Sequence, residues 1–188
     1  MWNNIIMQPI KMLAQWLLNN TNHEHYLFTL LNMRSLFPNM SNSAFKTLMT
    51  RAVRSELLTR LCRGLYLYKP ALPKDGLLLY HAAALLRADK FNYISLDTAL
   101  SDAGVISQIP LNWISIMSSG RSSIISCGEF GTIEYVHTRQ EPELLMHQLI
   151  YDHSCGLWRA NVHLAIRDMK ATHRNCDLID WSIVNEFI

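Results

Sequence analysis

The spacing of apolar residues along the first third of the chain is typical of helices. Apolar side chains recur at positions i, i+3, i+4 and i+7, which places them on one face of a helix. Pro9 precedes the first such pattern, the polar run 19–22 ends it, and Pro38 stops the second. The run 40–43 is rich in residues that cap helices and precedes the third. The predicted helices span residues 10–18, 29–37 and 43–57.

A hairpin is predicted directly after the third helix, over residues 58–69. Arg63 and Gly64 form its tip, and its second arm alternates leucine with tyrosine. Two prolines follow, and the run 74–76 then has the composition of a linker.

The second half of the chain alternates between patterns typical of helices and of strands. Glycine- and serine-rich turns at 119–121 and 128–131 separate three strand-like runs and favour an antiparallel meander. Breaks at 155–156 and 173–176 divide the remaining, helix-like stretch. The predicted elements are a helix over 77–88, a strand over 93–95, a helix capped by Ser95 or Asp97 that ends at Gly104, strands over 113–118, 123–127 and 132–137, and helices within 141–188.

The order of these elements predicts an α+β protein with two domains. A winged helix-turn-helix has the element order helix, helix, turn, helix and hairpin. The first part of the chain has this order, so we assign residues 1–75 to such a domain. Residues 76–188 are expected to form a mixed α/β domain with a small antiparallel sheet and C-terminal helices. A length of 188 residues suits one domain or two small ones and excludes a large barrel enzyme.

Charge distinguishes the two halves more clearly than composition does. Hydrophobic residues make up 49% of the chain and charged residues 17%, which favours a folded protein over a disordered one. The formal net charge is only +2, but it divides into +6 over residues 1–75 and −4 over residues 76–188. A basic front half is typical of proteins that bind nucleic acid, whereas an acidic remainder favours a protein partner or a regulatory role.

The third helix carries its cations and hydroxyls on the side opposite its apolar residues, and that polar side has no acid because Glu56 falls on the apolar side. Such a face suits the major groove of DNA, and arginines on the hairpin suit phosphate or the minor groove. The alternative is an ordinary solvated helix face. Arg34, in the second helix, could either contact the DNA backbone or be solvated, and the sequence does not decide between the two. The predicted DNA-binding residues are Ser43, Lys46, Thr47, Thr50, Arg51, Arg54, Arg60 and Arg63.

Tyr66 and Tyr68 on the second arm of the hairpin permit two interpretations. Exposed aromatic rings on a basic surface would form a stacking platform for single strands. An aromatic face that packs the hairpin onto the helices is the favoured interpretation.

Candidates for catalysis in the second half are weak. The run 152–155 (Asp-His-Ser-Cys) contains an acid, a base and nucleophiles, but neighbours in sequence point in different directions. The histidines do not pair at i, i+4, so surface positions are favoured over metal ligation. The run 118–123 lacks the pattern of a phosphate-binding loop and is interpreted as a hairpin turn that leaves Arg121 exposed. We expect no catalytic residue, no cofactor and no metal.

Cysteine usage and hydropathy favour a cytoplasmic protein. The four cysteines, at positions 62, 127, 155 and 176, contain no Cys-x-x-Cys pair and are expected to be reduced. The longest apolar stretch, near 77–86, is far shorter than the roughly 20 residues that a membrane helix needs. The start Met1–Asn4 does not have the pattern of a secretory signal.

Several of these segments are similar to a known family. The run Leu57–Tyr68 (LLTRLCRGLYLY), together with Phe28-Thr-Leu, resembles the winged helix of the AbiEi-type antitoxins of type IV (abortive-infection) toxin–antitoxin systems. The run Tyr93–Pro110 resembles the family segment Y-[IV]-S-L-x-[ST]-A-L-x-x-x-G with its downstream proline. Less specific similarity occurs at Gly131–His137, Glu141–Glu143 and Asp177–Trp181.

This resemblance implies an antitoxin, involved in phage defence, that is not an enzyme. Its winged helix would bind double-stranded DNA at its own promoter and repress the operon there. Inverted repeats in that promoter would suit a dimer on DNA. The second domain would counter a nucleotidyltransferase-like toxin, directly or indirectly. Two alternatives stay open: a winged-helix regulator of mobile-element genes without a toxin, and an enzyme that acts on nucleotides through the His- and Cys-containing second half.

Overall fold

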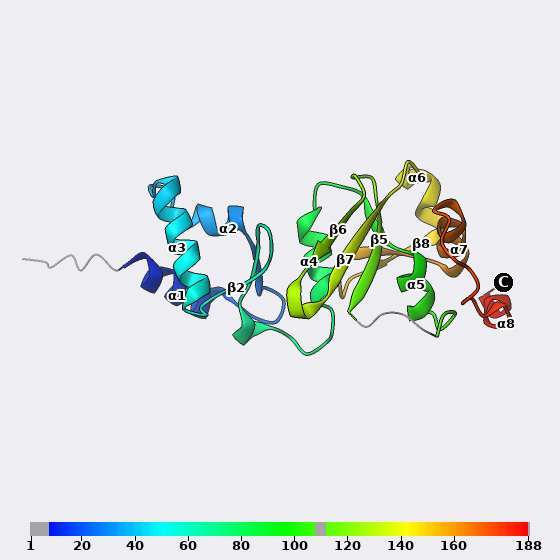
Figure 1. The fold of residues 1–188 in the computed structure, drawn as a ribbon, viewed down its shortest axis with the longest axis horizontal. Coiled ribbons are helices and arrows are strands. Elements are labelled where there is room, and N and C mark those ends of the chain that lie inside the picture. Colours follow the sequence, from blue (N-terminus) through cyan, green and yellow to red (C-terminus); the bar gives the residue numbers. More distant parts are fainter. Residues whose placement is uncertain (1–7, 108–111, 188) are drawn as a thin grey trace, which may run out of the picture. The chain divides into compact units, whose positions relative to one another are not determined.

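The chain folds into two compact units (Figure 1). The computed structural model describes residues 8–107 and 112–187. The units are Met1–Gly76 and Leu77–Ile188, and the boundary predicted after residue 75 lies one residue before this division. The start of the chain and the end of the Tyr93–Pro110 segment lie outside the described residues. Both units combine helices with strands, so the α+β class is confirmed.

The first unit contains three helices and three short strands among its described residues. Thr29 begins the second helix with a capping box, because its hydroxyl accepts the Asn32 N–H at 3.1 Å while its own N–H donates to the Asn32 amide oxygen at 2.9 Å. The elements are α1 (Pro9–Asn20), β1 (Leu27–Thr29), α2 (Leu30–Ser35), α3 (Asn42–Arg54), β2 (Thr59–Cys62) and β3 (Leu65–Leu67), followed by the 3-10 helix η1 (Lys69–Ala71).

The strands of this unit form an antiparallel sheet in the order β1-β3-β2. The β2–β3 hairpin was predicted, whereas β1 was not, because a segment of three residues is too short to show a strand pattern. Tyr66 lies in the central strand β3 and Tyr68 directly follows it, and the two residues are 8% and 7% exposed. This burial agrees with the packing interpretation and leaves little ring surface for a stacking platform.

The second unit alternates helices and strands throughout its described residues. Its helices are α4 (Leu78–Leu86), α5 (Leu96–Asp102), α6 (Pro142–Leu145), α7 (Val162–Ala171) and α8 (Trp181–Val184), with short 3-10 helices η2 (Gly128–Phe130), η3 (Met146–Gln148) and η4 (Asn185–Phe187). Its strands are β4 (Asn92–Ile94), β5 (Trp113–Ser118), β6 (Ser123–Ser126), β7 (Thr132–His137), β8 (Leu149–Asp152) and β9 (Leu157–Ala160).

The sheet of the second unit differs from the predicted small antiparallel meander. Its described residues form six strands in the order β6-β7-β5-β4-β9-β8, and the pairs β5–β7 and β4–β9 are parallel. The β6–β7 hairpin around 128–131 forms as predicted, but β7 then lies between β6 and β5. The run 118–123 is therefore a crossover and not a hairpin turn. The guanidinium of Arg87 stabilises it by donating to Ser118 Oγ, Ser123 Oγ and the Arg121 carbonyl, at 3.1, 2.8 and 2.6 Å.

The prediction of helices alone after residue 141 is also wrong, because this region supplies β8 and β9. These strands pair with each other in a hairpin around Gly156. β9 in turn pairs with β4, more than sixty residues earlier in the chain. Such distant pairing leaves no periodic signal in a four-residue segment.

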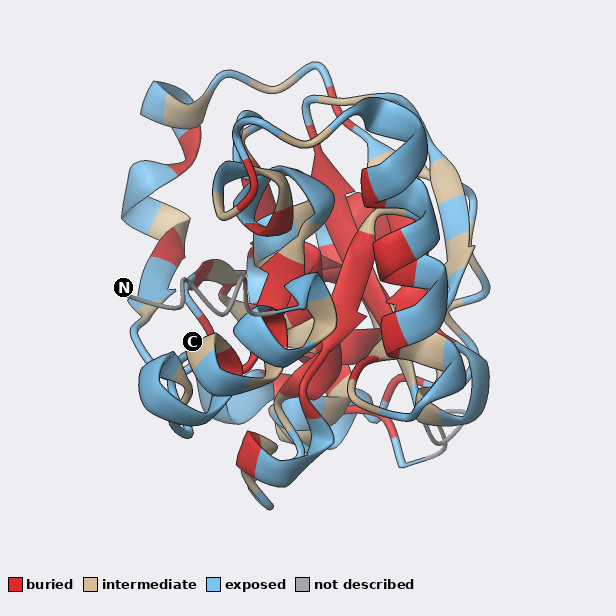
Figure 2. Cartoon of the chain, turned by 90° about the vertical axis from the view of Figure 1, so that its left-hand side faces the viewer, coloured by how far each residue is buried: buried red, intermediate tan, exposed pale blue. Residues whose placement is uncertain are grey.

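Helices cover both faces of this sheet. Neighbouring residues of β7 point to opposite faces, as strand geometry requires. Tyr135 donates its hydroxyl to the Ala83 carbonyl of α4 at 2.8 Å, whereas Glu134 contacts Arg174, which follows α7. Accordingly, α4 lies on one side of the sheet and α5 and α7 on the other (Figure 1). Buried positions concentrate on the strands, and the outward sides of the helices are exposed (Figure 2).

Candidate nucleic-acid interface

Helix α3 presents one buried and one exposed side. Ser41 caps its N-terminus by accepting the Ala44 N–H at 3.3 Å, and the apolar side buries Phe45, Leu48, Met49 and Ala52. All six predicted DNA-binding residues of the helix are exposed. These residues are Ser43, Lys46, Thr47, Thr50, Arg51 and Arg54.

The polar side of α3 contains no carboxylate, and the reason differs from the one predicted. The helix ends at Arg54, three residues earlier than expected. Glu56 therefore does not lie on the apolar side of the helix. It occupies the following turn with φ of 57°, a left-handed conformation that terminates helices.

The threonines of this face have a restricted hydrogen-bonding capacity. Thr47 and Thr50 donate their hydroxyls to the carbonyls four residues earlier, Ser43 O at 3.0 Å and Lys46 O at 2.9 Å. Each hydroxyl keeps lone pairs that can accept a hydrogen bond but has no second proton to donate. On a duplex these threonines would therefore accept from base amino groups or contact thymine methyls, and donation to phosphate would fall to the cations.

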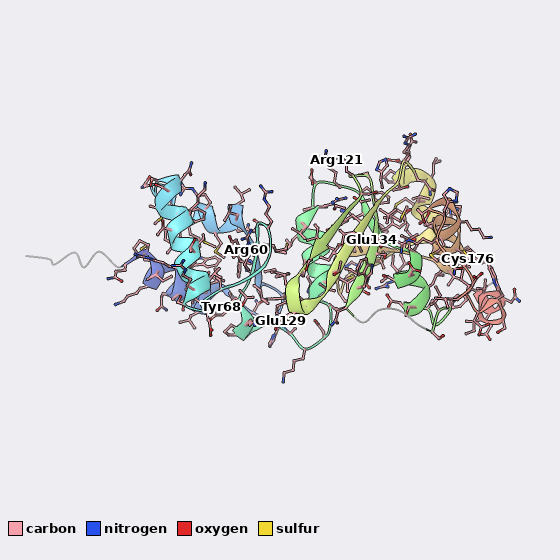
Figure 3. The ribbon with its side chains drawn as sticks, in the orientation of Figure 1. Arg60, Tyr68, Arg121, Glu129, Glu134 and Cys176 are labelled. Carbon is pink, nitrogen blue, oxygen red and sulfur yellow. The ribbon has the colours of Figure 1, made fainter. Side chains whose placement is uncertain are left out.

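A groove of about 510 Å³ joins α3 to the β2–β3 hairpin. Lys46, Thr50 and Arg54 line it from α3. Arg60, labelled in Figure 3, lines it from β2. Its floor is apolar and includes Phe45, Met49, Val53, Leu30 and part of Tyr66. Cations from two elements therefore meet at one concave surface, which suits a phosphate backbone beside the helix.

The hairpin is anchored to the helices at its tip. The Gly64 carbonyl accepts the Leu30 N–H of α2 at 2.9 Å, and Gly64 takes the left-handed conformation that the turn requires, with φ of 84°. Arg63, beside it, is exposed but does not line the groove. The structure thus brings Arg60 to the α3 cations and leaves Arg63 at the exposed turn.

Arg34 belongs to the framework that positions α3. Its guanidinium donates to the carbonyls of Phe37 and Met40, the latter at 2.6 Å, and lies 5.3 Å from the centre of the Phe45 ring. These contacts tie the connection between α2 and α3 to the first turn of α3. The structure therefore gives Arg34 a structural role that the sequence did not indicate.

We expect Arg34→Lys to destabilise the first unit while leaving the salt dependence of DNA binding unchanged. Lysine keeps the charge but lacks the planar fork that bridges two carbonyls, so the free energy of unfolding should fall by about 1–2 kcal/mol. Urea unfolding, resolved to the first unit by hydrogen exchange, measures this loss. A normal unfolding free energy combined with a shallower salt slope would instead place Arg34 on the DNA.

Two arginines of the second unit each connect a pair of acids. Arg174, three residues after the end of α7, pairs with Asp97 and, at 2.5 Å, with Glu134. Glu134 also accepts the Ser115 hydroxyl at 2.9 Å. Although burial opposes it, this hydrogen bonding lowers the pKa of Glu134. Figure 3 shows Glu134 on the sheet.

Arg159 of β9 makes the second connection, to Asp102 and, at 3.0 Å, to Asp152. Tyr80 joins the cluster through Asp102 at 3.4 Å, and burial raises the pKa of Tyr80 to about 12. These ion pairs link helices to strands, so we interpret them as structural contacts that stabilise the second unit.

The segment Tyr93–Leu100, which carries the family resemblance, is largely core. Ile94, Leu96 and Leu100 are fully buried. Ser95 precedes α5 without capping it, because its hydroxyl donates to the buried Asp168 of α7 at 2.7 Å, and Asp97 pairs with Arg174 instead. The predicted capping by either residue is therefore wrong.

Sequence reasoning missed Asp168 and the arginine clusters. The signal available for Asp168 was an acid among the apolar positions of α7, where Ala165 and Met169 are also buried. No comparable signal marks Arg159 or Arg174, because their partners come from distant segments.

The run 152–155 forms the turn between β8 and β9 and assembles no activated nucleophile. Ser154 donates its hydroxyl to Asp152, and His153 packs edge-on against Tyr151, with ring centres 4.8 Å apart. Cys155 is buried, and burial raises the pKa of its thiol to about 11. The thiol therefore stays protonated at neutral pH, unlike a nucleophilic thiolate.

Metal and membrane signatures are absent from the described part of the chain. No group of three or more His, Cys, Asp or Glu residues there could hold a metal ion. None of the described helices combines the length and the apolar character needed to cross a membrane. All four cysteines lie in the described residues and are free thiols.

Comparisons with the models of known protein families and with curated proteins return no match to this chain.

Proposed function

We propose that the first unit is a winged helix-turn-helix that binds double-stranded DNA. The order α1-β1-α2-α3-β2-β3 supports this, with α3 as the recognition helix and the β2–β3 hairpin as the wing. The observation that carries the proposal is the acid-free, exposed side of α3 beside Arg60. A duplex carries one negative charge per roughly 1.7 Å, so such a face gains counterion-release free energy that a mixed-charge face does not.

We further propose that the whole chain is a cytoplasmic antitoxin that represses its own operon and counters a nucleotidyltransferase-like toxin. The support is the resemblance at Leu57–Tyr68 and Tyr93–Pro110, together with the opposite charges of the two units. A duplex repels an acidic second unit, which leaves that unit for a protein partner. Inverted repeats in the promoter would place two copies on the DNA.

DNA binding is tested by titrating the full chain against its promoter duplex and a scrambled duplex at several salt concentrations. The candidate interface offers five cations, so the slope of log K against log salt should approach about −4.5 on the promoter. These cations are Lys46, Arg51, Arg54, Arg60 and Arg63. The promoter should bind more tightly than the scrambled duplex. A flat slope, or equal affinity for the two duplexes, would contradict the proposal.

The antitoxin role is tested separately, by expressing the full chain together with the product of the adjacent gene. Rescue of growth by a chain carrying Arg51→Ala and Arg54→Ala would place the neutralising activity outside the DNA-binding face. If the product of the adjacent gene is not toxic, the alternative of a regulator of mobile-element genes would be favoured.

A further inference from the structure

Strand β8 forms one edge of the six-stranded sheet. Its ladder to β9 continues through Gln148, whose carbonyl accepts the Asn161 N–H at 2.9 Å. Because hydrogen-bonded pairs alternate along an antiparallel ladder, the N–H and C=O groups of Leu149 and Tyr151 point away from β9. The Leu149 N–H donates to the Met146 carbonyl at the end of η3, whereas no backbone hydrogen bond among the described residues outside this ladder reaches the Leu149 carbonyl or the backbone groups of Tyr151. The edge is therefore open to another strand.

The segment that contains this strand also exposes an unusual amount of apolar surface. Leu144 and Met146 are 67% and 44% exposed, and Ile150 and Tyr151 are 71% and 40% exposed. Natural proteins protect open edges with lysine, proline or bulges, and this strand contains none of them. Four exposed apolar side chains within eight residues are typical of an interaction surface.

Aromatic side chains lie on the same edge. Tyr151 is the cross-strand partner of Trp158, and their ring centres lie 5.1 Å apart. The His153 ring also contacts the Tyr151 ring edge-on, with ring centres 4.8 Å apart. Tyrosine and tryptophan held in fixed positions are the residues that dominate binding energy at protein interfaces.

The charge of this segment specifies its partner. Residues 141–153 contain three acids and neither lysine nor arginine. Asp152 is paired with Arg159, whereas Glu141 and Glu143 are exposed and form no described ion pair. Glu141 is the N-cap residue of α6 and Glu143 lies in its first turn, and a segment with this charge attracts a basic partner and repels an acidic one.

We propose that the β8 edge, defined as residues 141–153, docks an extended basic segment of a partner protein, which adds a seventh strand beside β8. Backbone hydrogen bonds to the Leu149 carbonyl and to the N–H and carbonyl of Tyr151 would supply affinity. Apolar side chains of the segment would cover Ile150, and its lysines or arginines would face Glu141 and Glu143. This inference rests on the part of the proposed function that gives the second unit a protein partner.

The experiment measures binding of a fluorescent eight-residue peptide, in which lysine and valine alternate, to the full chain. The opposite edge supplies a matched control, because Ile124 of β6 is 65% exposed and also lies on an edge strand. Ile150→Lys should weaken binding about tenfold or more, since it adds like charge at the docking strand, while Ile124→Lys should change binding less than about twofold. Methylating alternate peptide nitrogens should abolish binding, because these N–H groups pair with β8.

Each other outcome overturns the proposal. Equal losses at both edges would indicate non-specific attraction between charges, and unchanged binding of the methylated peptide would exclude strand addition. Absence of peptide binding to the unsubstituted chain would exclude a basic segment as the partner. Sedimentation that shows a dimer dispersed by Ile150→Lys would make a second copy the occupant. Because neither DNA nor toxin is present, failure here is distinguishable from failure of promoter binding or growth rescue.

Discussion

A chain carrying Arg51→Ala and Arg54→Ala is expected to bind its promoter about 100-fold more weakly than the unsubstituted chain. An arginine that contacts a base contributes about 1–3 kcal/mol, so two of them account for about 3 kcal/mol. Both side chains are exposed and form no ion pair with a described acid, so their removal should leave folding intact. The slope of log K against log salt should become shallower by about 2. Fluorescence anisotropy on the promoter duplex measures both quantities.

The matched control removes the same charge from elsewhere in the first unit. Lys11 and Lys74 are both exposed, and neither lies on α3 or the hairpin. Lys11→Ala combined with Lys74→Ala should weaken binding less than about threefold, because long-range attraction is screened over roughly 8 Å at physiological salt. Equal losses in the two double variants would mean that net charge, and not the α3 face, drives association.

Local patterns predicted the elements of this candidate interface well. Helix α3 has thirteen residues, a serine cap and an apolar stripe, and each of these is readable from neighbouring residues. The β2–β3 hairpin was equally readable from Arg63-Gly64 and the alternating arm. The groove that brings Arg60 to Lys46 was not, because it depends on how the hairpin packs against the helix.

The second unit shows where local patterns fail. β7 inserts between β6 and β5, so consecutive strands are not neighbours and the meander prediction is wrong. Likewise, Arg174 meets Asp97 from 77 residues away. The stability of these elements comes from contacts between distant segments, for which a single sequence has no periodic signal.

Asp168 connects more segments through hydrogen bonds than the other distant contacts described above. It is fully buried, and its carboxylate accepts Tyr93 at 3.0 Å and Ser95 at 2.7 Å on one oxygen and Gln140 at 3.2 Å on the other. One side chain of α7 therefore satisfies donors from β4, from the residue before α5 and from the chain after β7. Burial raises the pKa of Asp168, and the hydrogen bonds oppose that shift.

We expect Asp168→Ala to lower the unfolding free energy of the second unit by about 3 kcal/mol, because it leaves buried hydroxyls of Tyr93 and Ser95 without an acceptor. Asp168→Asn should cost less, since one oxygen remains. Because the pKa of Asp168 is raised in the folded state, the folded unit holds a proton that the unfolded chain releases at about pH 4. The contribution of this carboxyl to stability therefore falls as pH rises from about 4 through the folded-state pKa. Asp168→Asn should remove this pH dependence.

Urea unfolding across pH measures both effects, and the exposed Asp177→Asn is the control. A loss no larger than that of the control would show that the three donors find other partners and that Asp168 does not hold the sheet to α7.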